Sequence, residues 1–183
     1  MTADAFRRTP LADRSSDLSA IGARLVPHLS QVALRLDPTD AFRSPFPLPV
    51  GPNTAEIVDD VDALWLGPDE WLLVGPPDAA ADITSELETV LSEVNRSIVD
   101  VSANRVAIDL VGDRLHLLSH VCPIDLEPPA WIEGRCAQTL VGRGQALLHE
   151  RPGSTRLFAR PSFAGYVVDL LLAVRELSGD VRA

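Results

Sequence analysis

The alternation of apolar and polar positions predicts strands early in the chain. Toward the end of residues 24–36, large apolar residues occupy alternate positions, as in a strand that buries one face. Two short apolar runs follow at 63–66 and 70–74, and the turn-forming residues Gly, Pro and Asp at 67–69 separate them. We therefore expect a first strand within 24–36 and a β-hairpin after it.

After the predicted hairpin, the spacing of the apolar residues changes from that of a strand to that of a helix. Apolar residues recur on one face of a predicted helix between Ile83 and Val94, and Asp78 lies where its side chain could cap the first turn. Between the first strand and the hairpin, residues 37–53 contain five prolines, each of which fixes φ and removes a backbone donor. An irregular, extended connection is expected there.

The second half of the chain predicts further strands and two helices. Residues 97–111 are strand-like with a turn or bulge at 102–104, and a short helix is expected between Asp113 and Pro123. A final amphipathic helix begins at Ser162, with Phe163 and Tyr166 facing inward, and ends near Gly179. Three more strands are expected at 139–141, 146–149 and 156–159.

This order of elements is typical of the α+β class. We expect a mixed or antiparallel sheet with about three helices packed on it. Residues 1–18 show no clear hydrophobic period, so residues 1–30 are expected to form a poorly ordered arm. The rest, residues 31–183, is expected to fold as a single α+β domain.

Composition narrows the classes of partner. The net charge of −10 argues against nucleic acid, because a nucleic-acid binder needs a positive surface to displace counterions. No apolar run approaches the roughly 20 residues that span a bilayer, and the N-terminal sequence does not resemble a secretory signal. We expect no membrane association and a cytoplasmic location, where Cys122 and Cys136 would be free, buried thiols.

The candidate chemical motifs are incomplete. His116 and His120 have the i, i+4 spacing of a helical zinc pair but lack the Glu of an H-E-x-x-H motif. Cys136 lies beside Arg135, which could lower a thiol pKa, although a buried inert thiol is the commoner outcome. Gly142 and Gly144 are a fragment of a dinucleotide-binding loop and are better explained as a turn. The sequence therefore assigns no catalytic, cofactor-binding or metal-ligating residue.

Five segments of the chain, taken in order, resemble those of a known family. The octapeptide WLGPDEWL at 65–72 resembles a signature of the gamma subunits of heterotetrameric sarcosine oxidase, and Trp65, Gly67 and Trp71 form its structural motif. The other similar segments are 99–105, 122–126, 134–143 and 160–166. Together these segments cover about residues 55–175.

The resemblance implies a fold akin to the aminomethyltransferase folate-binding domain. It implies a complex that demethylates sarcosine to glycine, passes the one-carbon unit to tetrahydrofolate and releases hydrogen peroxide. In this family the larger flavoprotein subunits hold FAD, FMN, NAD and tetrahydrofolate, and no catalytic residue or bound cofactor is expected in the gamma subunit itself.

Two further functions stay open beside a non-catalytic subunit: a stand-alone folate-binding one-carbon transfer protein, and an orphan paralogue that forms a homodimer when isolated. If the chain is a subunit, it must act through its surface, and interface cores favour Arg and aromatic side chains. Arg105, Arg143 and Arg160 all lie in family-like segments. At least one of them is expected to contact a larger flavoprotein subunit.

Overall fold

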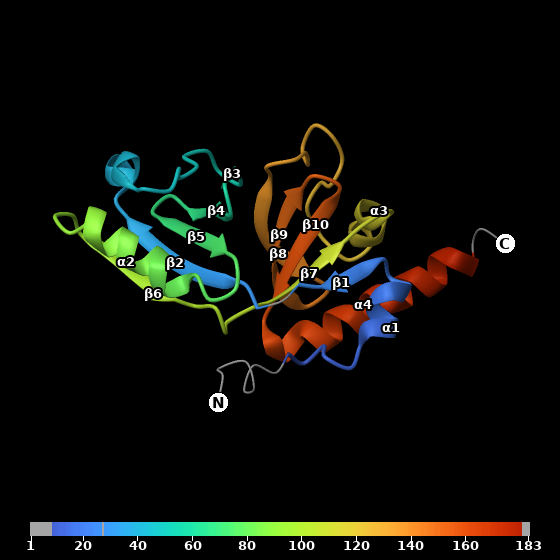
Figure 1. Ribbon diagram of the computed structural model, residues 1–183. Coiled ribbons are helices and arrows are strands. Elements are labelled where there is room, and N and C mark those ends of the chain that lie inside the picture. Colours follow the sequence, from blue (N-terminus) through green and yellow to red (C-terminus); the bar gives the residue numbers. More distant parts are fainter. Residues whose placement is uncertain (1–8, 27, 181–183) are drawn as a thin grey trace, which may run out of the picture. The chain divides into compact units, whose positions relative to one another are not determined.

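The structure, a computed structural model, describes residues 9–26 and 28–180 (Figure 1). The chain divides into two compact units. Unit 1 comprises Met1–Val26, Arg105–Glu133 and Gln138–Ala183, and unit 2 comprises Pro27–Asn104 and Gly134–Ala137. Each unit contains a five-stranded sheet.

The N-terminal segment carries regular structure within unit 1. Helix α1 (Ser15–Ala20) leads into strand β1 (Ala23–Leu25), which pairs antiparallel with β7 (Val106–Leu110). Leu11, Leu18 and Ile21 are buried, so apolar contacts as well as strand pairing hold this segment in unit 1. This differs from the expected division into an arm, 1–30, and one domain, 31–183; residues 1–8 and 27 of that arm lie outside the described residues.

Unit 2 is built on the strands that the alternation predicts. The first strand and the hairpin are confirmed, and hydrogen-bonded neighbours follow the order β3-β4-β5-β2-β6. All of these pairings are antiparallel. The strands are β2 (Ser30–Leu36), β3 (Ala55–Val58), β4 (Val61–Gly67), β5 (Glu70–Gly75) and β6 (Arg96–Asp100).

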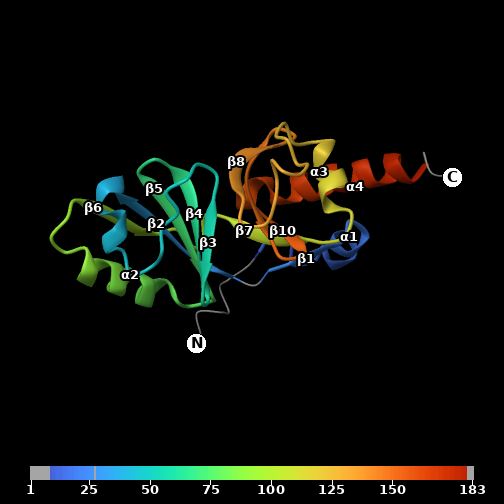
Figure 2. The ribbon, with the colours of Figure 1, turned by 90° about the horizontal axis from the view of Figure 1, so that it is seen from above.

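Helix α2 (Ala80–Val90) packs against β2 and β6 of this sheet (Figure 2). Ile83 and Leu87 are buried in an apolar cluster with residues of β2 and β5. The prediction that Asp78 caps α2 is wrong, because the N-cap residue is Ala79 and no side chain caps the helix. Asp78 instead has φ of 67°, which places it in the turn before the helix. The 3₁₀-helix η2 (Pro38–Arg43) lies in the proline-rich connection.

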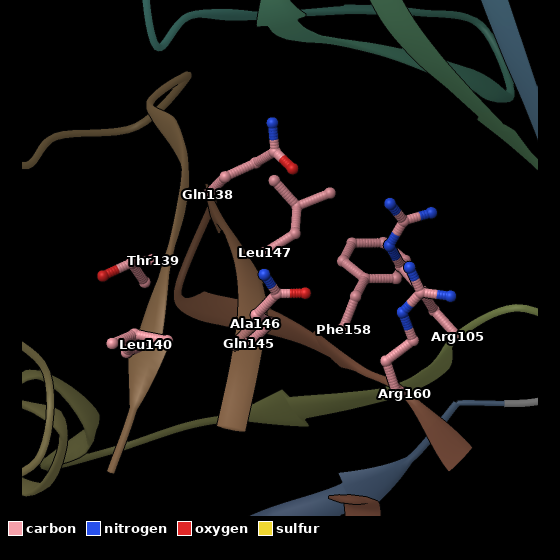
Figure 3. Close-up of a pocket in the computed structure, with 9 residues that line it drawn as sticks. All are labelled: Arg105, Gln138, Thr139, Leu140, Gln145, Ala146, Leu147, Phe158 and Arg160. Atoms are coloured by element: carbon pink, nitrogen blue, oxygen red, sulfur yellow. The ribbon is translucent and has the colours of Figure 1, made fainter. Parts of the chain in front are cut away.

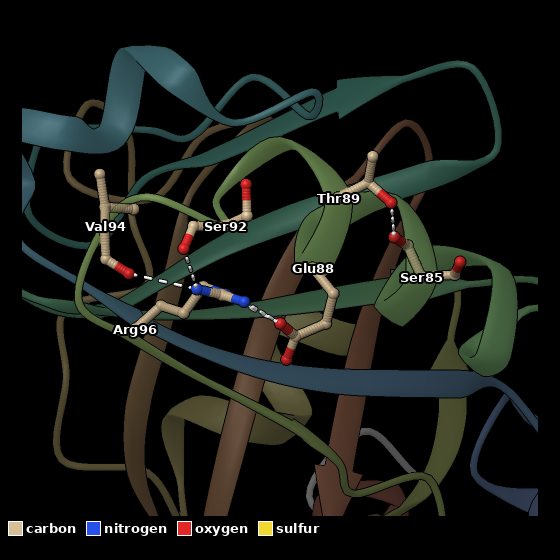
Figure 4. Close-up of polar contacts among 6 residues, drawn as sticks. All are labelled: Ser85, Glu88, Thr89, Ser92, Val94 and Arg96. Atoms are coloured by element: carbon tan, nitrogen blue, oxygen red, sulfur yellow. Dashed lines mark hydrogen bonds and ion pairs between the residues drawn. The ribbon is translucent and has the colours of Figure 1, made fainter.

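The side chain of Arg96, at the start of β6, contacts both helix α2 and the turn that follows it (Figure 4). Its guanidinium pairs with Glu88 of the helix. The same group donates hydrogen bonds of 3.2 Å each to the backbone carbonyls of Ser92 and Val94. One side chain thereby satisfies carbonyls that have no helical partner and links the helix end to the edge of the sheet.

The sheet of unit 1 has the strand order β1-β7-β10-β9-β8. The strands at 139–141, 146–149 and 156–159 are confirmed as parts of β8 (Cys136–Val141), β9 (Gly144–Arg151) and β10 (Ser154–Ala159). The strand-like stretch at 97–111 does turn at 102–104, as expected, and its two parts are strands β6 and β7 in different sheets. The chain turns between them, where the backbone N–H of Ser102 donates to the Asp100 carboxylate at 2.9 Å.

Two helices complete unit 1: α3 (Arg114–Ser119) and α4 (Pro161–Asp180). Figure 1 shows α4 running along the sheet, where it contacts β9 and β10. Val167 and Leu171 are buried, but Phe163 and Tyr166 are 42% and 38% exposed, so the prediction that both rings face inward is wrong. Among the described helices, none combines the length and the apolar character that crossing a bilayer would require.

Candidate functional site

A pocket of about 300 Å³ opens on the sheet of unit 1 (Figure 3). Every residue that lines it belongs to unit 1. The lining comprises two arginines, two glutamines, a threonine and four apolar residues: Arg105, Arg160, Gln138, Gln145, Thr139, Leu140, Ala146, Leu147 and Phe158. Among these described lining residues there is no Asp or Glu, so the charges in the lining are positive.

Strand register brings the two arginines to one end of the sheet. Strands β7 and β10 pair antiparallel with Val106 opposite Ala159. Arg105 immediately precedes Val106 and Arg160 immediately follows Ala159, so the two arginines leave neighbouring strands at the same end. In Figure 3 their guanidinium groups lie in the same part of the pocket as the Phe158 ring. Residues far apart in sequence thus form one positively charged rim.

The apolar base of the pocket comes from two paired strands. Phe158 of β10 lies directly opposite Leu147 of β9, and opposite residues of an antiparallel pair project from the same face of the sheet. Both side chains are buried. Gln138 extends beside Leu147 in Figure 3 and supplies a side-chain amide that can both donate and accept hydrogen bonds. The pocket therefore combines an apolar base with a cationic and polar rim.

Arg143 lies apart from this pocket, in the turn between β8 and β9. Its backbone N–H donates to the Tyr166 hydroxyl at 3.0 Å, and its side chain is exposed. The rings of Tyr166 and Phe163 meet edge to face with centroids 6.4 Å apart. We call Arg143, Phe163 and Tyr166 the Arg-aromatic patch. The structure thus joins Arg105 with Arg160 in the pocket and places Arg143 in a different feature of unit 1.

The tryptophan hairpin is a core element of unit 2. Trp65 and Trp71 are directly opposite each other on β4 and β5. Trp71 is only 1% exposed, and its indole N–H donates to the Pro49 carbonyl at 2.8 Å. Trp65 is partly buried against the same apolar cluster, and the register shifts between Trp65 and Gly67, as at a β-bulge. These contacts give the motif a packing role.

A buried group of polar side chains in unit 1 was not anticipated from the sequence. The Glu150 carboxylate pairs with Arg114 of α3 and accepts a hydrogen bond from the Thr155 hydroxyl. It also accepts a hydrogen bond of 2.9 Å from the indole N–H of Trp131. Every donor comes from a different part of the chain, so the sequence offered no local signal. The donors compensate the cost of burying a carboxylate.

A second polar row crosses three strands of the same sheet. Asp109, Arg156 and His149 lie opposite one another on β7, β10 and β9. The Arg156 guanidinium donates to both Asp109 oxygens, at 2.8 and 3.1 Å. Burial, with the nearby charges of Arg151 and Arg156, lowers the pKa of His149 to about 3. The imidazole is therefore neutral near pH 7.

The two cysteines and the histidine pair are the remaining candidates for chemistry that the sequence offered. Both cysteines are free and buried, as expected. Burial raises the pKa of Cys136 to about 12, and the thiol donates to the Thr54 carbonyl at 3.1 Å, so it stays protonated. The rings of His116 and His120 lie edge to face with centroids 4.7 Å apart. Within the described ranges, no three His, Cys, Asp or Glu side chains gather closely enough to hold a metal ion.

Comparisons with known proteins identify relatives over most of the chain. Residues 46–176 match the family described as "Sarcosine oxidase, gamma subunit family". A sarcosine oxidase subunit gamma from Corynebacterium sp. (strain P-1) is 31% identical over 183 residues, with 91% of this chain and 88% of the relative covered.

Two solved structures resemble the fold. A chain of the heterotetrameric sarcosine oxidase from Corynebacterium sp. U-96, solved with pyrrole 2-carboxylate, has a TM-score of 0.82 at 27% identity, with 93% of this chain and 95% of that chain covered. Aminomethyltransferase T of the glycine cleavage system from Bartonella henselae has a TM-score of 0.62 at 14% identity, with 86% of this chain and 48% of that chain covered. The second likeness concerns the fold alone.

Proposed function

The chain belongs to the sarcosine oxidase gamma subunit family, and we propose that it is the non-catalytic gamma subunit of a heterotetrameric sarcosine oxidase. The observation that carries this proposal is the close likeness, over 93% of this chain, to a chain of a heterotetrameric sarcosine oxidase. A match of that extent accounts for both units and leaves little of the chain for a separate function.

In this proposal the chemistry belongs to the larger flavoprotein subunits, in the cytoplasm. They would hold FAD, FMN, NAD and tetrahydrofolate, demethylate sarcosine to glycine, transfer the one-carbon unit to tetrahydrofolate and release hydrogen peroxide. The state of this chain's own reactive groups supports such a division of labour. Cys136 is buried with its pKa raised to about 12, and its thiol is therefore a poor nucleophile near neutral pH.

The Arg-aromatic patch has the composition of a docking surface for a partner. Tyr, Phe and Arg are enriched in interface cores, and Phe163 and Tyr166 expose 42% and 38% of their surface. The Tyr166 hydroxyl accepts the Arg143 N–H, so the turn and the helix present these side chains in a fixed arrangement. Of Arg105, Arg143 and Arg160, we therefore place Arg143 in the contact with a larger flavoprotein subunit.

Charge reversal tests this contact. The variant Arg143→Glu should weaken capture of the co-expressed larger subunits at least about tenfold, because losing a charged hot-spot contact costs about 2 kcal/mol or more. Arg175→Glu on α4, also exposed, is the matched control and should assemble as the parent does. If Arg143→Glu assembled as well as the parent chain, the contact would lie elsewhere on the surface. The variants Arg105→Glu and Arg160→Glu would then show whether the rim of the pocket contacts a larger subunit.

The isolated chain separates this proposal from the two alternatives. Purified alone, it should be colourless and should oxidise no sarcosine. Flavin retained in stoichiometric amount through gel filtration would contradict the proposed role. Tight tetrahydrofolate binding by the isolated chain would favour the one-carbon transfer protein, and a homodimer that ignores the larger subunits would favour the orphan paralogue. The aminomethyltransferase likeness does not decide among them, because a shared fold does not convey a shared function.

A further inference from the structure

The histidine pair of α3 lies on one exposed face of a helix that is packed on its other side. His120 is the C-cap residue and keeps α-helical backbone angles, so it lies one turn after His116 on the same face. Both histidines are exposed, whereas Leu117 and Leu118 between them are buried and hold the helix in unit 1. The ring centroids are 4.7 Å apart. Two imidazoles are therefore held side by side on an anchored backbone.

A hydrogen bond determines which ring nitrogen of His120 is available to a ligand. Nδ1 of His120 lies 2.8 Å from the backbone carbonyl of His116. A carbonyl oxygen can only accept, so Nδ1 carries the proton and donates, and Nε2 of the neutral ring keeps its lone pair. Histidines that bind metal ions commonly donate their other ring N–H to a carbonyl or a carboxylate in this way. His120 thus has the tautomer that binds a metal ion through Nε2.

The separation of the two rings suits a single metal ion. An imidazole nitrogen binds Zn²⁺ at about 2.0 to 2.1 Å, and the ring centroid lies about 1.2 Å behind that nitrogen. Two imidazoles at about 90° to 110° around one ion therefore have centroids about 4.5 to 5.2 Å apart. The observed separation, 4.7 Å, lies within this range. The interplanar angle of 84° is compatible with it, because each ring can turn about its own metal–nitrogen bond.

The surroundings of the pair favour a cation. His116 and His120 lie at the C-terminal end of α3, where the last carbonyls of a helix carry a partial negative charge. The chain as a whole has a net charge of −10, so a bound divalent cation reduces its self-repulsion. The Glu of an H-E-x-x-H motif is the general base of a protease and does not bind the metal. Its absence here removes the hydrolytic chemistry and leaves the pair of nitrogen ligands.

We propose that His116 and His120 form a surface site for one late first-row divalent metal ion. The two imidazole nitrogens bind the ion, and water completes its coordination. Imidazole suits Ni²⁺, Cu²⁺ and Zn²⁺, whereas Mg²⁺ and Ca²⁺ prefer oxygen ligands. No third His, Cys, Asp or Glu of the described residues joins the pair, so the ion stays open to solvent and exchangeable. The site uses no residue of the pocket or of the Arg-aromatic patch and does not depend on the proposed function.

Calorimetric titration of the full chain with NiCl₂ tests the proposal. The chain is purified without a histidine tag. Ni²⁺ should bind saturably with one site per chain, and MgCl₂ at the same concentrations should give no measurable binding, because Mg²⁺ loses its water reluctantly and prefers oxygen ligands. Absence of saturable Ni²⁺ binding, or equal binding of Ni²⁺ and Mg²⁺, would overturn the proposal.

Substitutions identify the ligands. His116→Gln and His120→Gln should each weaken Ni²⁺ binding at least about tenfold, because loss of an outer-shell partner alone already costs metal sites about 10- to 100-fold in affinity. His28→Gln removes a different exposed imidazole and is the matched control, which should bind Ni²⁺ as the parent chain does. Parental affinity in either α3 variant would overturn the assignment, since a single imidazole cannot chelate the ion.

A measurement on the parent chain keeps the test valid if a variant fails to fold by circular dichroism. Ni²⁺ is paramagnetic and broadens the proton resonances of the groups that bind it. Substoichiometric Ni²⁺ should therefore broaden the ring resonances of His116 and His120 most strongly among the histidines. Strongest broadening at His28 or His149 would place the ion elsewhere and would overturn the proposal.

Discussion

The two units build similar sheets but bury different side chains. In unit 2 the core cluster around Trp71 is apolar throughout, and Ile83 and Leu87 of α2 pack into it. In unit 1 the sheet buries two carboxylates, Asp109 and Glu150, on different strands, and each is paired with an arginine. Among its described residues, the sheet of unit 2 buries one carboxylate, Asp62 of β4. Both units are five-stranded, so strand number does not explain the difference.

This difference shows which interactions favour a single folded structure in each unit. An apolar core tolerates volume-conserving changes, whereas a buried carboxylate is stable only when its partners are in place. Asp109 is held by Arg156, and Glu150 by Arg114, so unit 1 depends on pairings between distant parts of the chain. The same reliance on strand register creates the pocket, where Arg105 and Arg160 meet. The apolar cluster around Trp71 thus dominates unit 2, whereas unit 1 adds buried arginine–carboxylate pairs to its apolar core.

The largest effect should come from removing the central ring of unit 2. Trp71→Ala deletes a fully buried indole and its hydrogen bond to Pro49, and should lower the free energy of unfolding by about 3 to 5 kcal/mol. Trp65→Ala, at a partly buried position, should cost about half as much. Urea denaturation measures both. Equal and small losses would show that packing does not organise unit 2.

The next effect concerns the buried carboxylate of unit 1. Glu150→Ala leaves Arg114 without its partner in a mostly buried position and should destabilise the chain by about 3 kcal/mol. Adding Arg114→Met to that variant should restore part of the loss, because the uncompensated charge is then gone. A double-mutant cycle by urea denaturation gives the coupling energy. Simple additivity of the two changes would contradict the pairing.

The buried histidine of unit 1 predicts a dependence on pH. Its folded pKa of about 3 lies below the ordinary value of 6.5, so the unfolded chain takes up the proton first as pH falls. The contribution of neutral His149 to the free energy of unfolding is complete above pH 6.5 and declines as the pH falls toward 3. Between pH 7 and 5 the parent should lose about 2 kcal/mol more than His149→Gln, which cannot titrate. Parallel stability curves for the two proteins over that range would contradict the assignment.

The smallest expected effects on stability come from replacing single glycines by alanine. Gly142 has φ of 59°, and a Cβ there would collide with the Tyr166 hydroxyl, so Gly142→Ala should cost about 2 kcal/mol. Gly153 has φ of 71° with nothing nearby, and Gly153→Ala isolates the backbone cost of about 1 kcal/mol. In unit 2, a Cβ at Gly75 would come too close to one atom, the terminal Cδ1 of Ile83 at 2.8 Å, so Gly75→Ala should cost about 1 kcal/mol after repacking. If thermal unfolding showed equal losses of stability for Gly142→Ala and Gly153→Ala, the Tyr166 side chain would move aside at no energetic cost.

Local patterns predicted the elements of unit 2 and the late strands of unit 1. The alternation in β2 and the turn residues of the β4–β5 hairpin are encoded within a few positions, so they could be read directly. The division of 97–111 between two sheets could not, because alternation says which face of a strand is buried and not which strand lies beside it. The same limit explains why Asp78 was assigned a capping role that its left-handed backbone does not fulfil.

The candidate site shows the same limit. Arg105 and Arg160 could be selected from the sequence as arginines in family-like segments, but only the register of β7 on β10 shows that they share a pocket. Phe158 and Leu147 looked like ordinary strand residues, and their common face follows from pairing. Glu150 gave no signal at all, because each of its donors comes from elsewhere in the chain.

The antiparallel pairing of β2 with β6 has a consequence for the order of folding. Unit 2 is nearly continuous in sequence, and Val32 lies opposite Asp100, so the segments by which the chain enters and leaves unit 2 are held together. Pairing of β1 with β7 must otherwise close a loop of about 80 residues, at an entropic cost that slows folding. Once unit 2 has formed during synthesis, most of that loop is already closed. We therefore expect mutations that slow the folding of unit 2 to delay the pairing of β1 with β7.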